Sequence, residues 1–352
     1  MIGFALYGPQ AASHRVRLAQ YSPALQQVGI DLQVDALLGD AYVRARYGQG
    51  RSLWLWWLVC RSALRRLGCL LLLRLRPQPV LLYAELYPLL PGWLELLLLP
   101  RPYVLDLDDA FYLKYRQGRL RLLAPLLGGK LDRLIAAAAA VTAGSSELVR
   151  YASRLNGNVI FLPSVVDTEH YRPALAIKRN PERPFTVGWI GSPSTAPYLQ
   201  MLVEPLVQLA QEQPLRLLVI GAACAAIPGV QVEHHPWDAR SEVGWIQQFD
   251  VGVMPLPDNS WTRGKCAYKL IQCMACCIPV VASPVGANSD VITAETGFLA
   301  SDALAWQQAL RGLRDDPALR QQLGKAARQR IEQHYSLQTS APVLVQLIQS
   351  LA

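Results

Sequence analysis

The sequence has 352 residues, 52% of them hydrophobic and 17% charged, and it carries a formal net charge of +8 at pH 7. That length allows two domains, and that composition excludes a disordered or collagen-like chain. The seven cysteines include one Cys-x-x-Cys spacing, at 273–276, but no second pair that would complete a four-ligand metal site. We therefore expect no metal site and no disulfide framework. We also expect a reducing, cytoplasmic location. We expect no signal peptide, and the apolar run 79–100 contains two glutamates and internal prolines, which argues against a transmembrane span.

The positive charge is concentrated in the first half of the chain. Residues 1–175 contain 20 Lys and Arg against 12 Asp and Glu, whereas residues 176–352 contain 14 of each. Residues 44–76 contain eight arginines, no acid and the run SLWLWWLV, which is typical of a segment that lies on anionic lipid at the inner membrane surface. The alternative is an ordinary helix with a core face and a solvated arginine face. No nucleic-acid-binding motif accompanies the charge, so no nucleic-acid partner is expected.

The first half of the chain alternates apolar strands with helical segments. Residues 2–6 form the first predicted strand, and Ser13 is expected to cap a helix that runs to about Val28. Gly29 then ends this helix before a second strand at 30–34. Such alternation predicts a parallel sheet covered by helices on both faces. Further strands of this half are predicted at 79–85, 102–109 and 139–145.

The same alternation restarts after a polar, proline-rich linker at 162–184. A strand at 185–190 runs into Gly191, and Ser194 or Thr195 is expected to cap the next helix. The sequence therefore predicts an α/β protein of two Rossmann-like domains whose parallel sheets face each other across a cleft. The domains are residues 1–172 and 173–335, with a C-terminal helix at 336–352. The remaining strands are predicted at 215–221, 230–235, 249–256, 279–283 and 297–300.

Loops at the carboxyl ends of the strands are expected to bind the ligand. Arg263, Lys265 and Lys269 precede or begin a helix that runs to about Cys276, and the two lysines, four residues apart, are expected to share one helix face. Cations beside backbone N–H groups suit a diphosphate. Two turns supply such groups: Gly191, Ser192, Ser194 and Thr195 form one, and Gly286, Ala287 and Asn288 form the other.

Several segments resemble the retaining glycosyltransferases of family 4, which have the GT-B fold. The most specific is KLIQCMACCIPVVASPVGANSDVITAETGFLA at 269–300, followed by LPSVVDTEHY at 162–171. The resemblance implies transfer of a sugar from a nucleotide diphosphate-sugar donor to an acceptor, with retained anomeric configuration and with no metal or other cofactor. It also implies that residues 173–335 bind the donor, that residues 1–172 bind the acceptor, and that the helix at 336–352 crosses back to the N-terminal domain.

The resemblance also implies a role for individual residues. Asp108, Lys265 and Lys269 are expected to be catalytic. The acceptor side is expected to include Ser13, Arg15, Arg17 and Asp109. Donor binding is expected of Gly191, Ser192, Ser194, Thr195, Arg263, Gln272, Gly286, Ala287 and Asn288.

The sequence departs from the family pattern at two places. The family's donor motif has two glutamates separated by seven residues, and here Gly264 and Gln272 stand at those positions. Many members have a histidine where this chain has Asp108. A carboxylate there could steady an oxocarbenium-like transition state or orient the acceptor hydroxyl. Alternatively, the aspartates of this segment cap the following helix.

Several alternatives stay open. The basic segment 44–76 favours a hydrophobic or lipid-linked acceptor and a peripheral location on the inner membrane face, whereas a soluble acceptor is the other expectation. The missing glutamates favour an inactive nucleotide-sugar-binding protein, and a GT-B nucleotide-sugar epimerase is a further enzymatic alternative. An NAD-dependent Rossmann enzyme is disfavoured, because no Gly-x-Gly-x-x-Gly follows the first strand.

Overall fold

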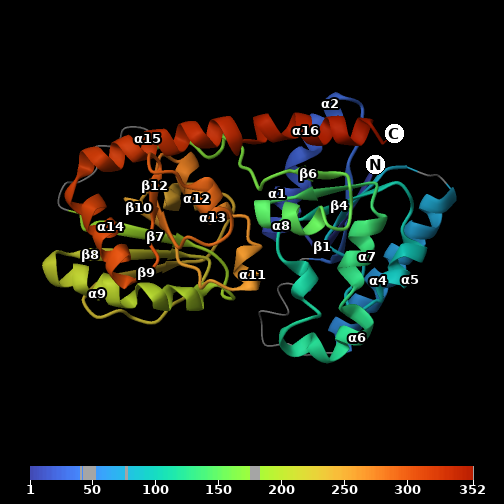
Figure 1. The fold of residues 1–352 in the computed structure, drawn as a ribbon, viewed down its shortest axis with the longest axis horizontal. Coiled ribbons are helices and arrows are strands. Elements are labelled where there is room, and N and C mark those ends of the chain that lie inside the picture. Colours follow the sequence, from blue (N-terminus) through green and yellow to red (C-terminus); the bar gives the residue numbers. More distant parts are fainter. Residues whose placement is uncertain (40–41, 43–52, 76–77, 175–182, 352) are drawn as a thin grey trace. The chain divides into compact units, whose positions relative to one another are not determined.

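The computed structural model describes residues 1–39, 42, 53–75, 78–174 and 183–351. The chain forms two units, and each has its own sheet (Figure 1). Unit 1 comprises Met1–Ser164, Gly264–Cys266 and Ser340–Ala352, and unit 2 comprises Val165–Arg263 and Ala267–Thr339.

The division between the units falls after Ser164, before the expected boundary at residue 172. Residues 165–171 belong to unit 2 because they are fastened to its helix α15 (Pro317–His334) and to the residues that follow it. Val166 forms a β-bridge with Ser336, and Arg328 on α15 donates from Nη2 to the Thr168 carbonyl at 2.9 Å. Helix α16 (Leu337–Gln349) covers most of the C-terminal segment expected at 336–352, and its residues from Ser340 onward belong to unit 1.

The sheet of unit 1 has six parallel strands in the order β2-β1-β3-β4-β5-β6. The predicted second strand begins later than expected, because the Ile30 N–H still donates to the Leu25 carbonyl and pairing with the first strand starts only at Gln33. The sixth strand was not predicted; it ends directly before the segment that was interpreted as a linker. The strands are β1 (Ile2–Tyr7), β2 (Gln33–Leu38), β3 (Val80–Tyr83), β4 (Tyr103–Leu107), β5 (Ala140–Ala143) and β6 (Val159–Phe161).

The single helix expected from Ser13 to Val28 is instead three short helices, and the prediction that Ser13 caps it is wrong. The N-cap position is Ala11, and Pro23 lies in the first turn of α2, where its missing N–H prevents one continuous helix. The helices of this part are α1 (Ala12–Arg17), η1 (Ala19–Tyr21) and α2 (Ser22–Gln27). The others between the strands are α4 (Leu53–Leu75), α5 (Gly92–Leu98), η2 (Phe111–Leu113), η3 (Gly118–Leu123), α6 (Ala124–Leu127), α7 (Lys130–Ala137) and α8 (Ser146–Ala152).

The sheet of unit 2 also has six parallel strands, in the order β12-β11-β10-β7-β8-β9. Counted from its own first strand, this order is 3-2-1-4-5-6, that of dinucleotide-binding sheets, in which ligands bind where the order reverses. That point lies between β7 and β10. The strands are β7 (Phe185–Ile190), β8 (Leu215–Ile220), β9 (Val230–His235), β10 (Val251–Met254), β11 (Val280–Ala282) and β12 (Gly297–Leu299).

Helices cover both faces of this sheet because successive side chains of the buried strands alternate between two cores. Val187 and Trp189 of β7 pack with α9 and α14, whereas Ile190 packs with α12 and α15. Figure 1 shows α9 and α15 on opposite sides of the strands. The helices of unit 2 not yet given are η4 (Ala196–Leu202), α9 (Val203–Glu212), α10 (Glu242–Ile246), α11 (Ser260–Arg263), α12 (Tyr268–Ala275), α13 (Ala287–Val291) and α14 (Ala303–Asp315).

Among the residues that the structure describes, no helix is both long enough and apolar enough to cross a membrane.

The close packing of Phe249 on β7 gives a stability prediction. A Cβ atom added at Gly188 would lie 2.0 Å from the Phe249 ring, whereas one added at Gly312 on α14 would meet nothing within 4 Å. We expect Gly188→Ala to lower the free energy of unfolding of unit 2 by about 1–3 kcal/mol or more, because the ring must move. Gly312→Ala, the matched control, should raise it by up to about 1 kcal/mol through helix propensity. Denaturant unfolding measures both, and equal midpoints would contradict this packing.

Candidate functional site

A buried ion pair organises the carboxyl ends of the strands in unit 1. Arg17 on α1 donates from Nε and Nη2 to Asp106 on β4 at 2.9 and 2.6 Å, and both side chains are fully buried. The Thr142 hydroxyl also donates to Asp106, at 2.6 Å, and Arg17 Nη2 donates to the Leu162 carbonyl at 2.9 Å. Arg17 was expected to contact the acceptor, but its burial makes that prediction wrong: it locks α1 to β4 and to the end of β6.

The first loop of unit 1 is held from within. Arg15 donates from Nη1 to the carbonyls of Pro9 and Gln10 at 3.1 and 2.8 Å, so its guanidinium braces the turn that follows β1. Ser13 lies half-buried in the first turn of α1. Both residues therefore lie at the carboxyl end of β1, where an acceptor contact was expected, and that role stays a prediction.

Asp108 lies just beyond the end of β4 and accepts a hydrogen bond from the Tyr83 hydroxyl at 2.6 Å. Burial raises the pKa of Asp108 to about 7, with smaller raising contributions from Asp106 and Asp109 and lowering ones from Arg17 and Tyr83. A carboxyl group with this pKa exchanges its proton near neutral pH, which suits a group that orients or deprotonates a hydroxyl. No helix cap involves Asp108, since the η2 helix that follows has Ala110 at its N-cap without a side-chain bond.

Lys265 pairs with Asp109 inside unit 1, Nζ to Oδ2 at 3.0 Å. The expectation that Lys265 and Lys269 share a helix face is wrong. Helix α12 begins only at Tyr268, because Ala267 adopts the left-handed conformation with φ of +52°. Lys265 consequently belongs to unit 1 and Lys269 to unit 2.

The same segment explains one departure from the family motif. A Cβ atom added at Gly264 would lie 2.6 Å from the Ala110 Cβ and 2.9 Å from the Ala110 nitrogen. A glutamate at position 264 therefore requires the backbone to shift. The thiol of Cys266 donates to the Asp108 carbonyl at 2.9 Å, so this segment also holds the chain around Asp108.

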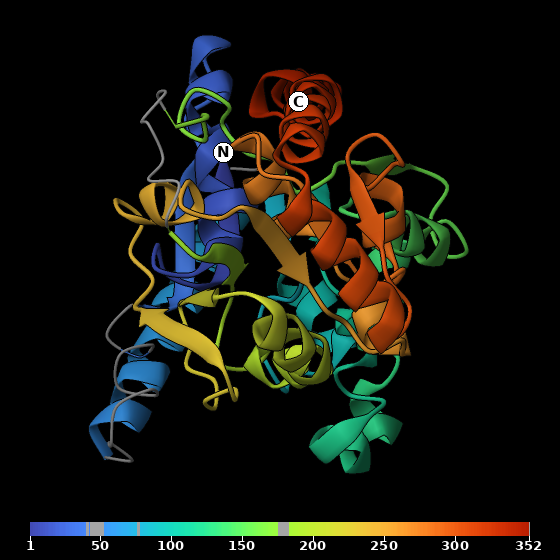
Figure 2. The same ribbon diagram turned by 90° about the vertical axis from the view of Figure 1, so that its left-hand side faces the viewer.

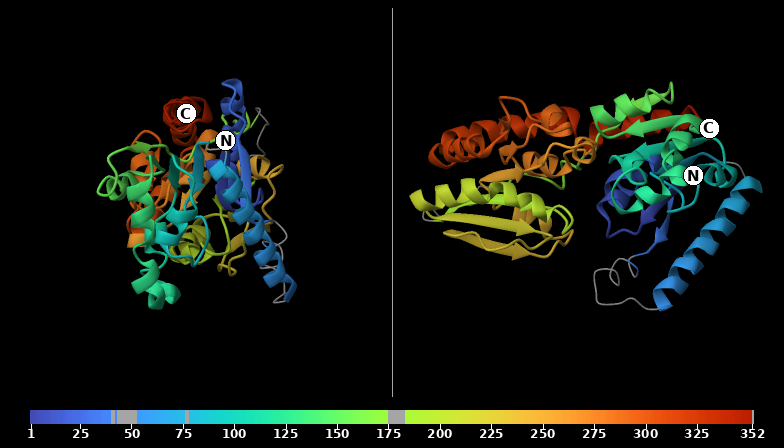
Figure 3. Two further views of the ribbon diagram at one scale, coloured as in Figure 1. Left: turned by 90° about the vertical axis from the view of Figure 1, so that its right-hand side faces the viewer. Right: turned by 60° about the horizontal axis from the view of Figure 1, so that its bottom comes forward.

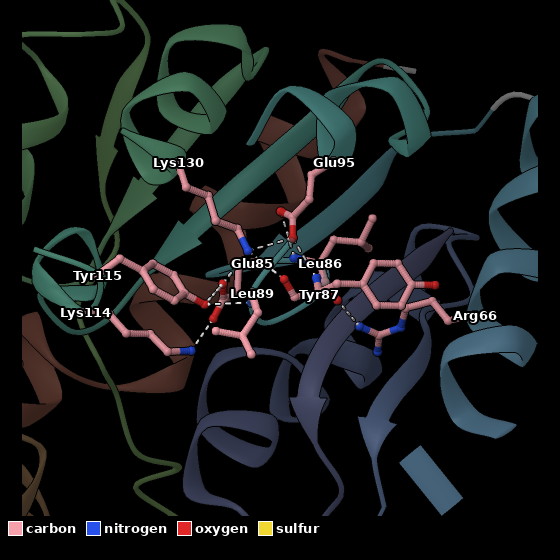
Figure 4. A network of polar contacts seen from close by, with 9 residues as sticks. All are labelled: Arg66, Glu85, Leu86, Tyr87, Leu89, Glu95, Lys114, Tyr115 and Lys130. Carbon is pink, nitrogen blue, oxygen red and sulfur yellow. Dashed lines mark hydrogen bonds and ion pairs between the residues drawn. The ribbon is translucent and has the colours of Figure 1, made fainter. Parts of the chain in front are cut away.

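A second buried network lies at the end of β3, which the sequence did not indicate (Figure 4). The Lys130 ammonium contacts Glu85 at 2.6 Å, Glu95 at 2.9 Å and the Tyr87 carbonyl at 2.6 Å. Burial alone would raise the pKa of Glu85, but Lys130 and Lys114 outweigh it and hold that pKa below its ordinary value. Because α5, α7 and the loop after β3 each contribute, the network fixes the shape of this loop.

In unit 2, a lysine is held over the turn that follows β7. Lys269 Nζ lies 4.3 Å from the centre of the buried Trp189 ring and donates to the Thr195 hydroxyl at 2.9 Å. A Cβ atom at Gly191 would lie 2.5 Å from both Lys269 Nζ and Trp189 Cη2, so only glycine leaves room for this arrangement. Ser192 and Ser194, whose hydroxyl oxygens lie 2.8 Å apart, are exposed in the same turn. The predicted proximity of this turn to Lys269 is thus present. Thr195 stands at the N-cap of η4, as expected, but its side chain makes no capping bond.

Gln272 is buried rather than exposed to a ligand. Its amide donates to the Tyr171 hydroxyl at 2.9 Å and to Glu242 at 3.3 Å. Glu242 in turn accepts from Tyr171 and from the Trp237 indole, both at 2.7 Å. Gln272 therefore supports a buried carboxylate that comes from α10, and the prediction that its side chain binds the donor is wrong. No local pattern indicates this contact, because Glu242 is 30 positions away from Gln272 in the chain.

The turn before α13 packs on Arg263. Gly286 has φ of +53°, and a Cβ atom there would lie 2.3 Å from the Arg263 carbonyl oxygen. The guanidinium of Arg263 pairs with Asp258 at 2.6 and 2.9 Å, on the surface. Asn288 is buried. Its side-chain amide donates to the Ser283 carbonyl, and its backbone N–H donates to the Val285 carbonyl. Asn288 therefore shapes the turn instead of offering groups to a donor. Ala287 begins α13 beside Gly286.

Two comparisons agree with this architecture. Residues 184–316 match the family model of glycosyl transferases group 1. Apart from Gly264–Cys266, the matched residues all lie in unit 2. A D-inositol 3-phosphate glycosyltransferase of Arthrobacter is 29% identical over 216 residues, which cover 53% of this chain and 48% of that protein. The chain thus spans about half the length of this curated relative.

Solved structures extend the likeness to both units. Sucrose-phosphate synthase from Thermosynechococcus elongatus superimposes with a TM-score of 0.69 at 18% identity, covering 99% of this chain and 98% of that one. The Anabaena protein HepE, solved with UDP and glucose, gives a TM-score of 0.67 at 14% identity and covers 99% of each chain. The predicted GT-B fold and the resemblance to group 1 glycosyltransferases are confirmed.

The Arg17–Asp106 pair gives a second stability prediction. Arg17→Met leaves Asp106 charged, buried and without its cation, so we expect a loss of about 3–5 kcal/mol in the free energy of unfolding of unit 1. The double variant Arg17→Met/Asp106→Leu should recover part of that loss, because no buried charge remains. Arg150→Met, which removes an exposed arginine from α8, should change stability by less than about 1 kcal/mol. Equal effects of Arg17→Met and Arg150→Met in calorimetry would refute the structural role of Arg17.

Proposed function

We propose that the protein is a glycosyltransferase that moves a sugar from a nucleotide diphosphate-sugar to an acceptor with retention of anomeric configuration. The observation that carries this proposal is the cluster of Lys269, Trp189 and Thr195 around Gly191. It lies at the carboxyl end of β7, beside the point where the strand order reverses, within the residues that match the group 1 family model.

The ammonium of Lys269 is suited to the charge that a leaving nucleotide diphosphate develops. Its position is set in advance by the Trp189 ring below it and the Thr195 hydroxyl beside it, so little reorganisation is needed when that charge forms. Gly191 lets a phosphate approach the backbone of the turn, and Ser192 and Ser194 add exposed hydroxyl donors. Lys265 is already paired with Asp109, and we therefore assign the main role in stabilising the diphosphate to Lys269.

Retention is proposed to proceed without an enzymatic nucleophile, with the leaving diphosphate guiding the acceptor hydroxyl to the same face of the sugar. Lysine supplies the positive charge that stabilises the leaving group, and we propose that no metal cofactor is required. Asp108 would orient the acceptor hydroxyl and receive its proton, which its pKa of about 7 permits.

The partners are proposed by analogy with the relatives. HepE has been solved with UDP-glucose, which supports a UDP-sugar as the first donor to test. The Arthrobacter relative is named for a phosphorylated acceptor. For this chain we propose a hydrophobic or lipid-linked acceptor, met at the cytoplasmic face of the inner membrane. Part of the supporting basic segment, residues 44–52 and 76, lies outside the described residues.

A donor-binding protein without turnover is the second candidate, and one observation favours it. Neither position of the family's glutamate pair offers a carboxylate: Gly264 packs on Ala110, and Gln272 is buried with Tyr171 and Glu242. Such a protein would bind a nucleotide without cleaving its sugar.

The proposed role of Lys269 is tested by donor cleavage. The purified protein is incubated with UDP-, GDP-, ADP- and TDP-sugars and free nucleotide is measured by mass spectrometry, with and without membrane lipids as acceptors. We expect one donor to be cleaved and Lys269→Ala to slow this by about 10²–10³-fold, as when one preorganised charge donor is removed. Lys325→Ala, which removes an exposed lysine from α15, is the matched control and should leave the rate unchanged. Tight nucleotide binding with no cleavage of any donor would establish the second candidate instead.

Asp108 gives a prediction about pH dependence. If the ionised carboxylate receives the proton, kcat should rise with pH through about 7, the pKa of Asp108, and level off above it. The Tyr83 hydroxyl lowers this pKa by hydrogen bonding, so Tyr83→Phe should move the inflection to higher pH. Asp108→Asn should abolish the inflection and most of the activity. An inflection near 7 that persists in Asp108→Asn would show that another group titrates.

A further inference from the structure

Exposed large apolar side chains are concentrated on one of the two units. Of those among the described residues, only Met201, Leu299 and Leu304 belong to unit 2, and the rest belong to unit 1. Patches of this kind mark surfaces that bind a partner or a membrane. Most of those in unit 1 lie on α4, near α5 and on η3–α6: Trp54, Trp56, Trp57, Leu64, Leu71, Leu72, Leu75, Leu89, Trp93, Leu97, Leu122, Leu123 and Leu126.

Helix α4 has an apolar stripe on its solvent side. Trp57, Leu64, Leu71 and Leu75 follow one another at spacings of seven, seven and four residues, which places them on one face of a helix. They are 55%, 68%, 52% and 79% exposed. The stripe therefore runs along much of the helix without covering from unit 1.

The opposite face of α4 is fixed to the sheet. Arg66 is fully buried and donates to Asp35 at 2.7 Å, to the Ala5 carbonyl at 2.6 Å and to the Leu86 carbonyl at 2.8 Å. Figure 4 shows its guanidinium pointing to the segment that follows β3. Because this anchor joins α4 to two strands and a loop, the helix cannot roll to bury its stripe.

The charged residues of α4 itself are all arginines. The helix contains no acid, and Arg61 and Arg74 are exposed at the sides of the stripe. Arg65 is exposed as well, but its guanidinium pairs with Asp35 of β2 at 2.9 Å. The Arg61 guanidinium lies 5.4 Å from the centre of the Trp57 ring. Tryptophans and leucines flanked by arginines are the composition of helices that lie in the headgroup region of an anionic bilayer.

A second element of unit 1 repeats this composition. Between Asp109 and Asp132 the chain has five cations and no acid, and Arg119 and Arg121 lie exposed beside Leu122, which is 85% exposed. The figures show α6 (teal) and the start of α4 (blue) extending beyond the sheet of unit 1 on the same side (Figures 1, 2 and 3). One flat surface can therefore touch both elements.

We propose that α4 and the η3–α6 segment form a two-point docking surface for an anionic lipid bilayer. The inference deepens the proposed function, because it names the surface on which a lipid-linked acceptor would be met. Arginines beside both apolar elements favour lipid headgroups over a second copy of the chain, whose own unit 1 is equally basic. Neither element belongs to the donor-binding cluster, so bilayer binding and donor cleavage can be measured separately.

The test is flotation of the full protein with vesicles of phosphatidylglycerol and phosphatidylcholine, beside vesicles of phosphatidylcholine alone. We expect binding to the anionic vesicles that weakens with salt. Leu64→Glu/Leu71→Glu and Leu122→Glu/Leu126→Glu should each lower the partition coefficient by about tenfold or more, because a charge replaces an inserted leucine. Leu299→Glu/Leu304→Glu in unit 2 is the matched control and should bind like the wild type. Thermal unfolding confirms that each variant is folded.

Equal binding of wild type and both unit 1 variants, or equal binding to neutral and anionic vesicles, would overturn the inference. So would a wild-type dimer in solution that Leu64→Glu/Leu71→Glu dissociates, since a second copy would then cover the stripe. Donor cleavage without vesicle binding would reject this inference and leave the proposed function standing. If the wild type binds vesicles, both unit 1 variants lose this binding, and no donor is cleaved, the docking surface stands and the proposed function is rejected.

Discussion

Buried ion pairs set the geometry of unit 1. The Arg17–Asp106 pair joins α1 to the end of β4, and two residues later the chain delivers Asp108 to the Tyr83 hydroxyl. Arg66 performs a similar task for α4 through Asp35. Since removing either partner would leave an uncompensated charge in the interior, these contacts resist rearrangement even where they add little net stability. The carboxyl edge of the sheet and the outward stripe of α4 both depend on them.

Close packing sets the geometry of the corresponding edge in unit 2. Gly191 has no side chain, and the space so left is filled by Trp189 and the end of Lys269. The lysine is thereby placed at the end of the central strand, where the topology already favours a ligand. A left-handed Ala267 separates this lysine from Lys265, so one short segment serves both units with different residues.

The sequence predicted the strands of unit 2 best: 185–190 and 230–235 agree with β7 and β9 to the residue. Apolar runs bounded by glycine or polar turns are local signals, and they suffice for such strands. Side-chain partners distant in sequence gave no such signal. The burial of Arg17 depends on Asp106, 89 positions away, and that of Gln272 on Tyr171, 101 positions away. Charged and polar residues near the right loops were therefore predicted to bind ligands, when several of them support the fold.

The central claim is that Lys269 and the turn after β7 receive the diphosphate of a nucleotide-sugar. The most direct test is a crystal structure of the protein with UDP bound. The account predicts the diphosphate at the carboxyl ends of β7 and β10, with Lys269 Nζ and groups of the Gly191–Thr195 turn within hydrogen-bonding distance of its oxygens. A nucleotide bound elsewhere would contradict this account. So would a diphosphate that contacts neither Lys269 nor Thr195 and leaves the hydrogen bond between them unchanged.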